Sequence, residues 1–409
     1  MTTATTTNAP GDYPLSRKRE MLLEEYDGVI AAAARGGGGS PHYPPSWSNR
    51  LGSVLTPVSI PGVYTADRPF YWNGIDVGGR MTVIRLQSSS SSYSSDDDDD
   101  DDDDEGGRRG DDLVVHSPVF LDPPLVEALS KLGNVAHVIS PNYEHVKYAK
   151  IWADYYPDAK VWGCPGLPDR EAGVRWTGEI PHGARPPGFF ANNDDATTTA
   201  TTTTKTTMTE EGGGSSAAAA AGGMWDWNEL MPYHVDFEAN PFTGRSFFNE
   251  VVFYHRPSKT LLTTDFYWNY PGGDGVTNGQ LVDDDDGVVG ATDVDDDEDF
   301  GPWDLAPSVG TIPLGSRLWG KVGMDRLFYP FYVNLMVGGD DNRDAFGDMA
   351  RHVACGGRCG GDDGDYATIT GGWDVETIIP CHGDIVRGRQ LCRRVLEKHF
   401  GVKCQASSK

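Results

Sequence analysis

Nine consecutive aspartates, Asp96 to Asp104, most constrain how this chain of 409 residues can fold. Like charges at that density repel one another and bury no apolar surface, so the run cannot belong to a packed core. Three other stretches are also biased in composition, being rich in threonine, glycine and alanine or in glycine and aspartate. We therefore predict one globular domain over residues 66–400 with inserts at 88–112, 192–223, 272–304 and 356–366. A mostly disordered region, 1–65, should precede the domain, and a short tail, 401–409, should follow it.

The formal net charge of −27 at pH 7 is concentrated in two of these inserts. Residues 88–112 hold twelve acids and two arginines, a net of −10. Residues 274–304 hold twelve acids and neither lysine nor arginine, a net of −12. The rest of the chain is therefore close to balanced. Because the acidic inserts repel phosphate, we expect no nucleic-acid partner.

The six cysteines are too few and too scattered for a disulfide framework, which favours a reduced intracellular compartment. Cys355 and Cys359 have no second pair of cysteines or histidines at zinc-finger spacing, so we expect no structural zinc there. No apolar run approaches the ~18 residues of a membrane span, and the N-terminal region has no apolar segment typical of a signal peptide. We expect a cytoplasmic chain without a membrane partner, with a plastid location through an atypical leader as the alternative.

Short β-branched runs alternate with helix signals along the rest of the chain. Asp122 before Pro123 is an N-cap and first-turn signal, and Arg256–Lys259 separates two apolar runs as a hairpin turn. We expect strands at Met81–Leu86, Leu113–His116, Val135–Ile139, Lys160–Gly163, Glu250–His255, Thr260–Thr264 and Glu376–Pro380. We expect helices at Asp122–Leu132, His145–Tyr155 and Asp384–Phe400. Because a hairpin occurs among alternating strands and helices, the sheets should be mixed rather than purely parallel.

Polar side chains follow three of these strands directly. Glu144 and His145 follow the strand that ends near Ile139, Asp265 follows Thr264, and His382 and Asp384 follow Pro380. Polar groups that leave the same edge of a sheet can converge, and imidazoles with carboxylates are ligands for zinc or iron. Taken singly, Asp265 could be a turn or cap residue, and His382 could be a turn histidine with satisfied hydrogen bonds.

The order of these motifs resembles the metallo-β-lactamase superfamily. The hairpin Val251–Thr264 ends in Asp265, where the superfamily has a metal-bridging aspartate, and Pro380-Cys381-His382-Gly383 matches its Pro-x-His-Gly ligand motif. More narrowly, Val114–Pro118 and Ser140–Asn142 resemble the branch called domain of unknown function family 4336. This resemblance implies an αββα sandwich, an α/β fold in which helices flank two mixed β-sheets.

The chain departs from the superfamily where the first ligand motif, His-x-His-x-Asp-His, is expected. Ser140–His145 stands there, so two histidines are absent and Glu144 replaces the aspartate. A further histidine is replaced near Ser246, and His234 does not align with it. The matching residues are His145, Asp265 and His382, which implies a degenerate site for one zinc or iron ion instead of two. Glu144 or Asp384 would act as the general base, and the sequence does not choose between them.

Other polar and aromatic groups are weaker candidates. Trp225–Trp227, Phe266–Trp268 and Phe328–Tyr332 are expected in the core or in the lining of a pocket. His116 ends a strand at the same edge as the ligands, and we expect it to support one of them by a hydrogen bond.

Three functions are compatible with this set of residues. The first is a single-metal hydrolase of a small ester, thioester or phosphate compound, as the resemblance implies. The second is a non-catalytic binding or scaffold protein that retains the fold without metal. The third, an iron-dependent redox activity, would use His145, His382 and Asp265 as a two-histidine, one-carboxylate set. In the first and third cases the partner is a small-molecule substrate.

Overall fold

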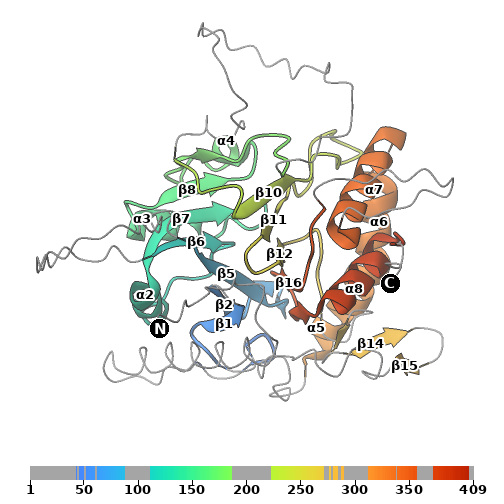
Figure 1. Ribbon diagram of the computed structural model, residues 1–409, viewed down its shortest axis with the longest axis horizontal. Helices are drawn as coiled ribbons and strands as arrows, with labels where there is room; N and C mark the ends of the chain where they lie inside the picture. Colours follow the sequence, from blue (N-terminus) through green and yellow to red (C-terminus); the bar gives the residue numbers. More distant parts are fainter. Residues whose placement is uncertain are drawn as a thin grey trace, which may run out of the picture.

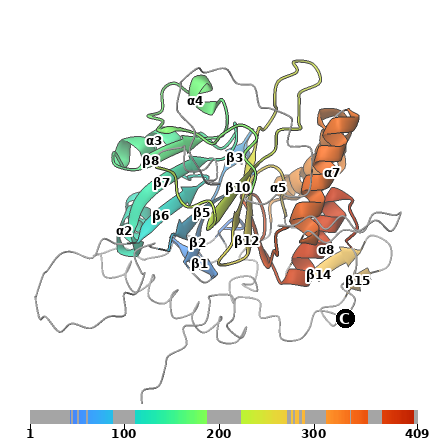
Figure 2. The same cartoon turned by 45° about the horizontal axis from the view of Figure 1, so that its top comes forward.

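The computed structural model describes residues 43, 46–49, 52–59, 62–87, 111–186, 223–270, 276–277, 280–283, 287–289, 312–337, 339–356 and 372–404. Two β-sheets lie face to face in the middle, and helices cover the outer face of each sheet (Figure 1). The view in Figure 2 shows the same order, with α2 and α3 on one side and α7 and α8 on the other. The predicted αββα sandwich of mixed sheets is confirmed.

Seven strands form the first sheet in the order β1-β2-β5-β6-β7-β8-β9. Each neighbouring pair from β1 to β6 is antiparallel, whereas each neighbouring pair from β6 to β9 is parallel. Their bounds are β1 (Thr56–Ser59), β2 (Val63–Arg68), β5 (Gly79–Arg85), β6 (Asp112–His116), β7 (Asn134–Ser140), β8 (Lys160–Gly163) and β9 (Gly178–Glu179). Because β6 and β7 are parallel, the residues that follow them emerge at one edge of the sheet.

Three helices follow strands of the first sheet: α2 (Pro123–Leu132), α3 (Ala149–Tyr155) and α4 (Leu167–Arg170). The Asp122 side chain accepts a hydrogen bond from Leu125 N and caps α2, as the sequence predicts. Leu125 and Leu129 of α2 and Trp152 of α3 pack against the outer face of the sheet. Burial of each such side chain stabilises the fold by about 1.5–3 kcal/mol, which holds both helices on this face.

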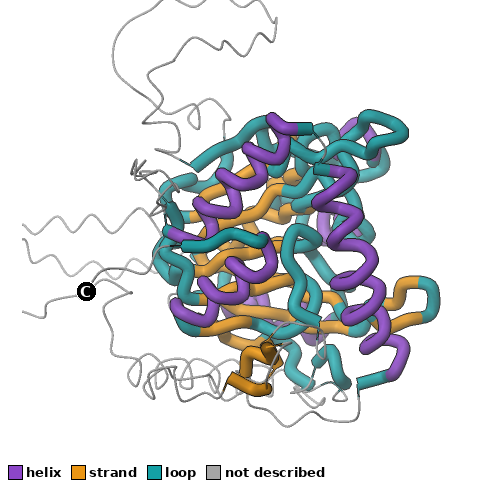
Figure 3. Tube along the Cα trace, turned by 90° about the vertical axis from the view of Figure 1, so that its right-hand side faces the viewer, coloured by secondary structure: helices purple, strands orange, loops and turns teal. Residues whose placement is uncertain are grey.

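Five strands form the second sheet in the order β10-β11-β12-β16-β17. Here β12 and β16 are parallel, and the other neighbours are antiparallel. The strands are β10 (Leu230–His234), β11 (Val251–His255), β12 (Thr260–Thr263), β16 (Thr377–Pro380) and β17 (Val386–Arg387). Helices α7 (Asp340–Cys355) and α8 (Arg389–Phe400) cover its outer face and share a core with it. Figure 3 views the molecule from this side, where helices lie in front of the strands.

The space between the sheets is filled by side chains that alternate with those facing the helices. In β6, Leu113 and Val115 face α2 and α3, whereas Val114 belongs to the core between the sheets. Phe253 of β11 and Leu262 of β12 meet this core from the second sheet. Because successive side chains point to opposite faces of a strand, one set packs on the helices and the other fills the space between the sheets.

One long helix lies between β12 of the second sheet and α7 in sequence. It consists of α5 (Leu314–Leu318), η3 (Trp319–Phe328), α6 (Tyr329–Phe331) and η4 (Tyr332–Met336), which follow one another without a break. The η segments have the wider hydrogen bonding of a π-helix. We call this element the 314–336 helix. The sequence predicted only an aromatic cluster at Phe328–Tyr332, not a helix.

Two small sheets complete the described structure. β3 (Tyr71–Trp72) and β4 (Ile75–Asp76) form a hairpin. β13 (Val276–Thr277), β14 (Gln280–Asp283) and β15 (Gly287–Val289) form a three-stranded sheet within the insert predicted at 272–304.

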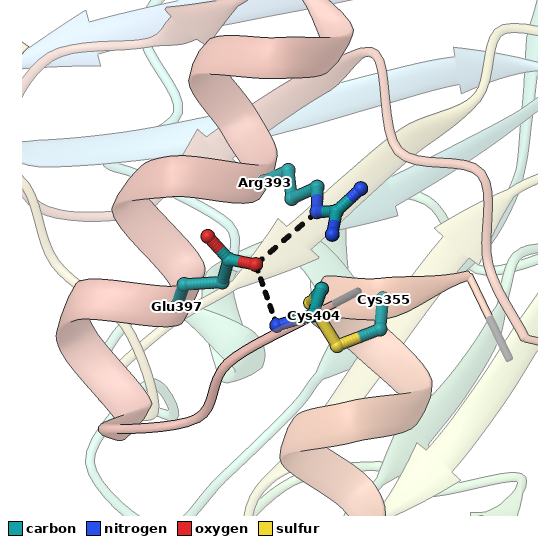
Figure 4. Close-up of a disulfide and its surroundings, with 4 residues drawn as sticks. All are labelled: Cys355, Arg393, Glu397 and Cys404. Carbon is teal, nitrogen blue, oxygen red and sulfur yellow. Dashed lines mark hydrogen bonds and ion pairs between the residues drawn. A yellow bond between two sulfur atoms is a disulfide. The ribbon is translucent and has the colours of Figure 1, made fainter. Parts of the chain in front are cut away.

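Cys355 at the end of α7 forms a disulfide with Cys404, which lies four residues beyond the end of α8 (Figure 4). The two Cα atoms are 5.2 Å apart, and the residues are separated by 49 positions. Glu397 of α8 accepts hydrogen bonds from Arg393 and from the Cys404 backbone, which holds the C-terminal segment beside the helix. The cysteine spacing did not predict this disulfide, because the packing of α7 on α8 brings the two residues together. Cys359 lies outside the described residues.

The observed elements agree with most of the predicted ranges to within two residues, and three boundaries differ by more than that. The second expected helix begins at Ala149 rather than His145, and the last begins at Arg389 after the short strand β17. The first sheet begins at Thr56, before the predicted domain start at residue 66. Most of the inserts at 88–112, 192–223 and 356–366 lie outside the described residues, as does most of the region 1–65. Among the described helices, none is both long enough and apolar enough to cross a membrane.

Candidate metal centre

Asp265 stands two residues beyond the end of β12, in a turn that the Glu250 side chain organises. One Glu250 oxygen accepts a hydrogen bond from Thr264 N, and the other accepts from Asp265 N and Phe266 N, all at 2.7–2.8 Å. Glu250 is buried directly before β11, and burial together with the Asp265 charge raises its pKa to about 7. This carboxyl group therefore fixes the backbone that carries Asp265.

His145 lies in the turn between β7 and α3, and Asn142 shapes that turn. The side-chain oxygen Oδ1 of Asn142 accepts hydrogen bonds from Glu144 N and His145 N, at 3.0 and 2.8 Å. Its amide nitrogen donates to Asp265 Oδ2 at 2.7 Å and to Thr264 Oγ1 at 2.9 Å. Asn142 is fully buried, so one side chain ties the His145 turn of the first sheet to the Asp265 turn of the second.

Ser117 follows β6 and holds the His145 ring. Its hydroxyl lies 2.6 Å from His145 Nδ1, which leaves His145 Nε2 directed at Asp265 Oδ2, 3.4 Å away. Ser117 has a φ of 54°, in the left-handed region that residues other than glycine rarely adopt. Such backbone strain persists where surrounding structure over-determines it, and here it aims the hydroxyl at the histidine.

His382 lies in the loop after β16, and Arg80 of β5 braces that loop. The Arg80 guanidinium donates to Pro380 O and Gly383 O and pairs with Asp67 at 2.7 Å. Gly383 has a φ of 95°, and a Cβ there would lie 1.9 Å from the carbonyl oxygen of Asn269, so only glycine fits. The loop is therefore locked on both sides of His382.

The tautomer of His382 follows from its partner. Nδ1 lies 2.8 Å from the carbonyl oxygen of Gly78. Because a carbonyl can only accept, Nδ1 carries the proton and Nε2 keeps a free lone pair. Nε2 is 3.8 Å from Asp265 Oδ1. An imidazole fixed in this way by a backbone carbonyl is typical of a metal ligand.

The structure brings His145, Asp265 and His382 together from the ends of three strands. Their three ligand atoms all lie within 4.8 Å of one another, and the two imidazole rings are 5.2 Å apart between centroids. Two ligand atoms bonded at about 2 Å to one ion lie at most about 4 Å apart. The distances from Asp265 to His145 and His382, 3.4 and 3.8 Å, are within that limit. Two imidazole nitrogens and one carboxylate form a donor set that both zinc and iron(II) accept.

Electrostatics couple the three groups. Burial opposes the charge of His145, but hydrogen bonds to Asp265 and Cys381 and their charges raise its pKa well above the ordinary value. Burial alone would raise the pKa of Asp265, but its neighbours, above all His145, hold that pKa below the ordinary value. Burial lowers the pKa of His382. The Asp265 carboxylate therefore favours the protonated form of His145, and a metal cation bound by both groups would compete with that proton.

A cavity of about 410 Å³ opens onto these groups. Its polar lining includes the three candidate ligands together with Glu144, Ser117, Arg80 and Lys147. The larger part of the lining is apolar, with Phe70, Trp72, Val77, Pro118, Val119, Tyr148, Phe247, Phe248, Tyr270, Trp319, Met324 and Phe328. A volume of this size is usual for small-molecule sites.

The two candidate bases differ in position. Glu144 lines the cavity, and burial, followed by the charge of Asp265, raises its pKa. Asp384 is not among the described residues that line the cavity, and its backbone binds Asn269. Geometry therefore favours Glu144, a choice that the sequence left open.

Other sequence candidates occupy different places. Trp225, Phe266, Tyr267 and Trp268 are buried, whereas Phe328 lines the cavity. His116 is buried edge-on to Phe253, and neither ring nitrogen has a hydrogen-bond partner among the described residues. Burial lowers the pKa of His116 to about 3. The expected hydrogen bond from His116 to a ligand is therefore not present.

A second group of possible donors, His182, His234 and Asp236, also lies within 4.8 Å. His234 Nδ1 accepts from Gly183 N, and Nε2 lies 3.0 Å from the side-chain oxygen Oδ1 of Asn249. Both ring nitrogens are thus occupied, and Asp236 is paired with Arg185 at 2.6 Å. His234 therefore has no free imidazole lone pair for an ion. This agrees with the predicted ligands, which do not include His234.

The sequence reasoning missed four residues that position the ligands: Ser117, Asn142, Glu250 and Arg80. Ser117 and Asn142 lie inside the motifs that carry the family resemblance, so their position beyond strand ends was a usable signal. Glu250 and Arg80 had no such signal. Glu250 binds a turn 15 residues further along the chain, and Arg80 of the first sheet binds a loop of the second sheet.

No protein-family model and no curated protein matches the chain. Similar solved structures include DIM-1 metallo-β-lactamase exposed to ceftazidime, at 9% identity and a TM-score of 0.35, over 84% of this chain and 96% of that one. A metallo-β-lactamase from Pontibacter korlensis has 11% identity and a TM-score of 0.35, over 84% and 98% of the two chains. The metal-soaked Flv1 flavodiiron core from Synechocystis has 11% identity and a TM-score of 0.39, over 85% and 60%. Likenesses of this size say nothing about chemistry, and the αββα layering rests on the strand order and cores described above.

Proposed function

We propose that this chain is a metallo-β-lactamase-like hydrolase with a degenerate site, which uses one zinc or iron ion held by His145, Asp265 and His382. The observation that supports it is the convergence of these three side chains at a cavity. Within the superfamily we assign the chain to the branch called domain of unknown function family 4336, on the motifs at Val114–Pro118 and Ser140–Asn142.

The donor set suits a catalytic rather than a structural ion. Structural zinc sites usually have four protein ligands, whereas catalytic sites have three and keep one position open. Here three side chains would supply ligands, and all three line the cavity. A zinc or iron ion held there would supply Lewis acidity that polarises a carbonyl or phosphoryl oxygen.

Glu144 is the proposed general base. It lines the cavity beside His145, and its raised pKa brings the carboxylate closer to the range in which proton transfer at neutral pH is efficient. Ser117 and Asn142 keep His145 and Asp265 in place while Glu144 accepts the proton.

The cavity lining defines the substrate we propose, a small ester, thioester or phosphate compound with an apolar group. Aromatic side chains provide most of the wall and suit an aryl or acyl group. Lys147 lines the same cavity with Nζ 4.6 Å from the centroid of the Phe70 ring, and it offers a positive charge to an anionic substrate group.

Elemental analysis of the purified full chain tests the metal site directly. We expect zinc or iron in the wild type and its loss in the double variant His382→Ala/Asp265→Ala. The matched control is His182→Ala/Asp236→Ala, which makes the same two substitutions in the other histidine–aspartate group and should retain the ion. A metal-free wild type at neutral pH would refute the proposal and favour the scaffold function.

Activity is tested separately with aryl ester, thioester and phosphate substrates. Glu144→Gln should keep the metal and lower kcat by about 10²–10⁴-fold, as expected for loss of a general base. Asp384→Asn is the control and should leave kcat unchanged. Loss of activity in Asp384→Asn but not in Glu144→Gln would reverse the assignment of the base.

A further inference from the structure

The outer side of the 314–336 helix exposes a line of large apolar side chains. Exposed fractions of 38–71% are found at every fourth or fifth residue, namely Leu314, Leu318, Val322, Leu327, Phe331 and Leu335. Spacings of four and five align because the π-helical turns of this element join residues five apart. We call these six residues the apolar stripe.

The inner side of the same helix is already used for packing. Trp319, Met324 and Phe328 line the cavity, and Tyr332 and Met336 belong to the core shared with α7 and α8. A helix that is apolar on all sides is normally buried on all sides. Contacts among the described residues therefore leave the stripe exposed, and exposed apolar surface of this kind marks an interaction site.

Three cations run beside the stripe. Arg317, Lys321 and Arg326 are exposed, and each directly precedes a stripe residue. The one acid of the helix, Asp325, is half-buried and accepts a hydrogen bond from Trp268 Nε1 at 2.8 Å. The exposed face of the helix thus combines apolar and basic side chains without an exposed acid, in a chain whose net charge is −27.

The β3–β4 hairpin extends this surface with aromatic rings. Tyr71 and Trp72 are 64% and 47% exposed, and the Trp72 ring lies 4.6 Å from the ring of Trp319 between centroids. Tryptophan and tyrosine are the residues enriched at the boundary between lipid and water.

We propose that the 314–336 helix and β3 dock the protein on the surface of a membrane that contains anionic lipids. The apolar stripe would enter the boundary between headgroups and acyl chains, the three cations would meet lipid phosphates, and Tyr71 and Trp72 would lie at headgroup level. Salt screens charges beyond about 8–10 Å, so the three cations act on lipid phosphates that lie close to this face.

Charge complementarity favours a lipid surface over a second copy of the chain. In a two-fold contact between two such helices the same face meets itself, and no exposed acid of the helix would neutralise Arg317, Lys321 and Arg326 of either copy. The proposal revises the expectation of no membrane partner, which rested on the absence of a spanning segment. A helix that lies flat on a membrane needs no such segment.

Docking has a consequence for the cavity. Because Trp319, Met324 and Phe328 of the same helix line it, the cavity lies within one helix diameter, about 10 Å, of the docked surface. The docking itself depends on no metal and no catalysis, so it can fail or succeed separately from the proposed hydrolase.

The test is co-sedimentation of the full chain with vesicles of phosphatidylcholine alone or mixed with phosphatidylglycerol. We expect the wild type to bind the mixed vesicles and to bind neutral vesicles much more weakly. The variant Arg317→Gln/Lys321→Gln/Arg326→Gln should weaken binding to mixed vesicles by about 100-fold, since each cation near an anionic surface contributes about fivefold.

A charge-matched control separates the face from the net charge. Lys131→Gln/Lys150→Gln/Lys403→Gln removes three exposed lysines from other parts of the described chain and should bind mixed vesicles like the wild type. Equal losses in the two triple variants would overturn the proposal, as would a wild type that does not sediment with the mixed vesicles.

The apolar contribution needs its own variant. Leu318→Ser/Leu327→Ser/Phe331→Ser changes exposed residues only, so the fold should remain, which an unchanged thermal transition would show. Vesicle binding should fall at least tenfold. Sedimentation velocity without lipid covers the remaining alternative, because a wild-type dimer that this variant converts to a monomer would assign the face to a second copy and overturn the membrane proposal.

Discussion

Replacing Asn142 with alanine should both destabilise the fold and weaken metal binding, because this side chain joins the turns that carry His145 and Asp265. Its amide donates at 2.7 Å to a buried carboxylate oxygen of Asp265 and at 2.9 Å to the hydroxyl of Thr264, which is fully buried. A hydrogen bond to a charged group contributes about 1.5–3 kcal/mol and a neutral one about 1 kcal/mol. The Asn142 side-chain oxygen also accepts hydrogen bonds from Glu144 N and His145 N, which are neutral donors in a half-buried turn. We expect the free energy of unfolding to fall by about 3 kcal/mol.

The assay combines urea denaturation of the metal-free chain at neutral pH with zinc titration of the folded protein. Loss of a group that orients a ligand lowers metal affinity by about 10–100-fold. The matched control is Asn228→Ala, which removes an exposed amide that binds Asp226 and should change stability by less than about 0.5 kcal/mol. A loss below about 1 kcal/mol in Asn142→Ala, with unchanged zinc affinity, would show that the bridge does not hold the site together.

Three further predictions concern pH, the disulfide and the His382 loop. Burial raises the pKa of Glu238 to about 7, so its contribution to stability is complete below the unfolded pKa and is lost as pH rises through the folded value. The wild type should therefore lose up to about 3 kcal/mol between about pH 5 and pH 8 from this group, and urea denaturation of Glu238→Gln should lack that loss. Reducing the Cys355–Cys404 disulfide, or Cys404→Ser, should lower the free energy of unfolding by about 4 kcal/mol for a loop of this length, and thermal melts with and without reductant should coincide only in the variant. Gly383→Ala should lower zinc affinity and the melting temperature together, because a Cβ would collide with the Asn269 carbonyl. An unchanged melt would contradict the geometry of the loop.

Local patterns in the sequence account for the elements that the structure confirms. Asp122 before Pro123 predicts the cap of α2 because the cap involves residues only three apart. The apolar runs at Leu113–His116 and Val251–His255 predict strands because a strand alternates its side chains over a few positions. The same patterns fail for the 314–336 helix, whose apolar residues point both into the cavity and outward, so no single face identifies it.

The three ligand candidates could be found from the sequence because each lies within six residues after an apolar run. Their convergence could not, because it requires the parallel pairing of β12 with β16 and the packing of the two sheets. The choice of Glu144 over Asp384 as the base also depends on this packing, which places the first in the cavity lining and not the second. Arg80 donates hydrogen bonds to Pro380 and Gly383, which lie 300 and 303 residues further along the chain. No local sequence pattern can predict such a contact.

By itself the sequence determined the acidic inserts, the mixed α/β architecture and the residues that end the three strands, since these follow from charge density and short-range periodicity. The tertiary structure decided which polar groups meet, which tautomer His382 adopts, and that Cys355 reaches Cys404. It also decided that the apolar stripe of the 314–336 helix faces outward. The physical reason is distance along the chain: capping and alternation act over a few residues, whereas a site depends on side chains that only the packing of whole sheets and helices brings within bonding range.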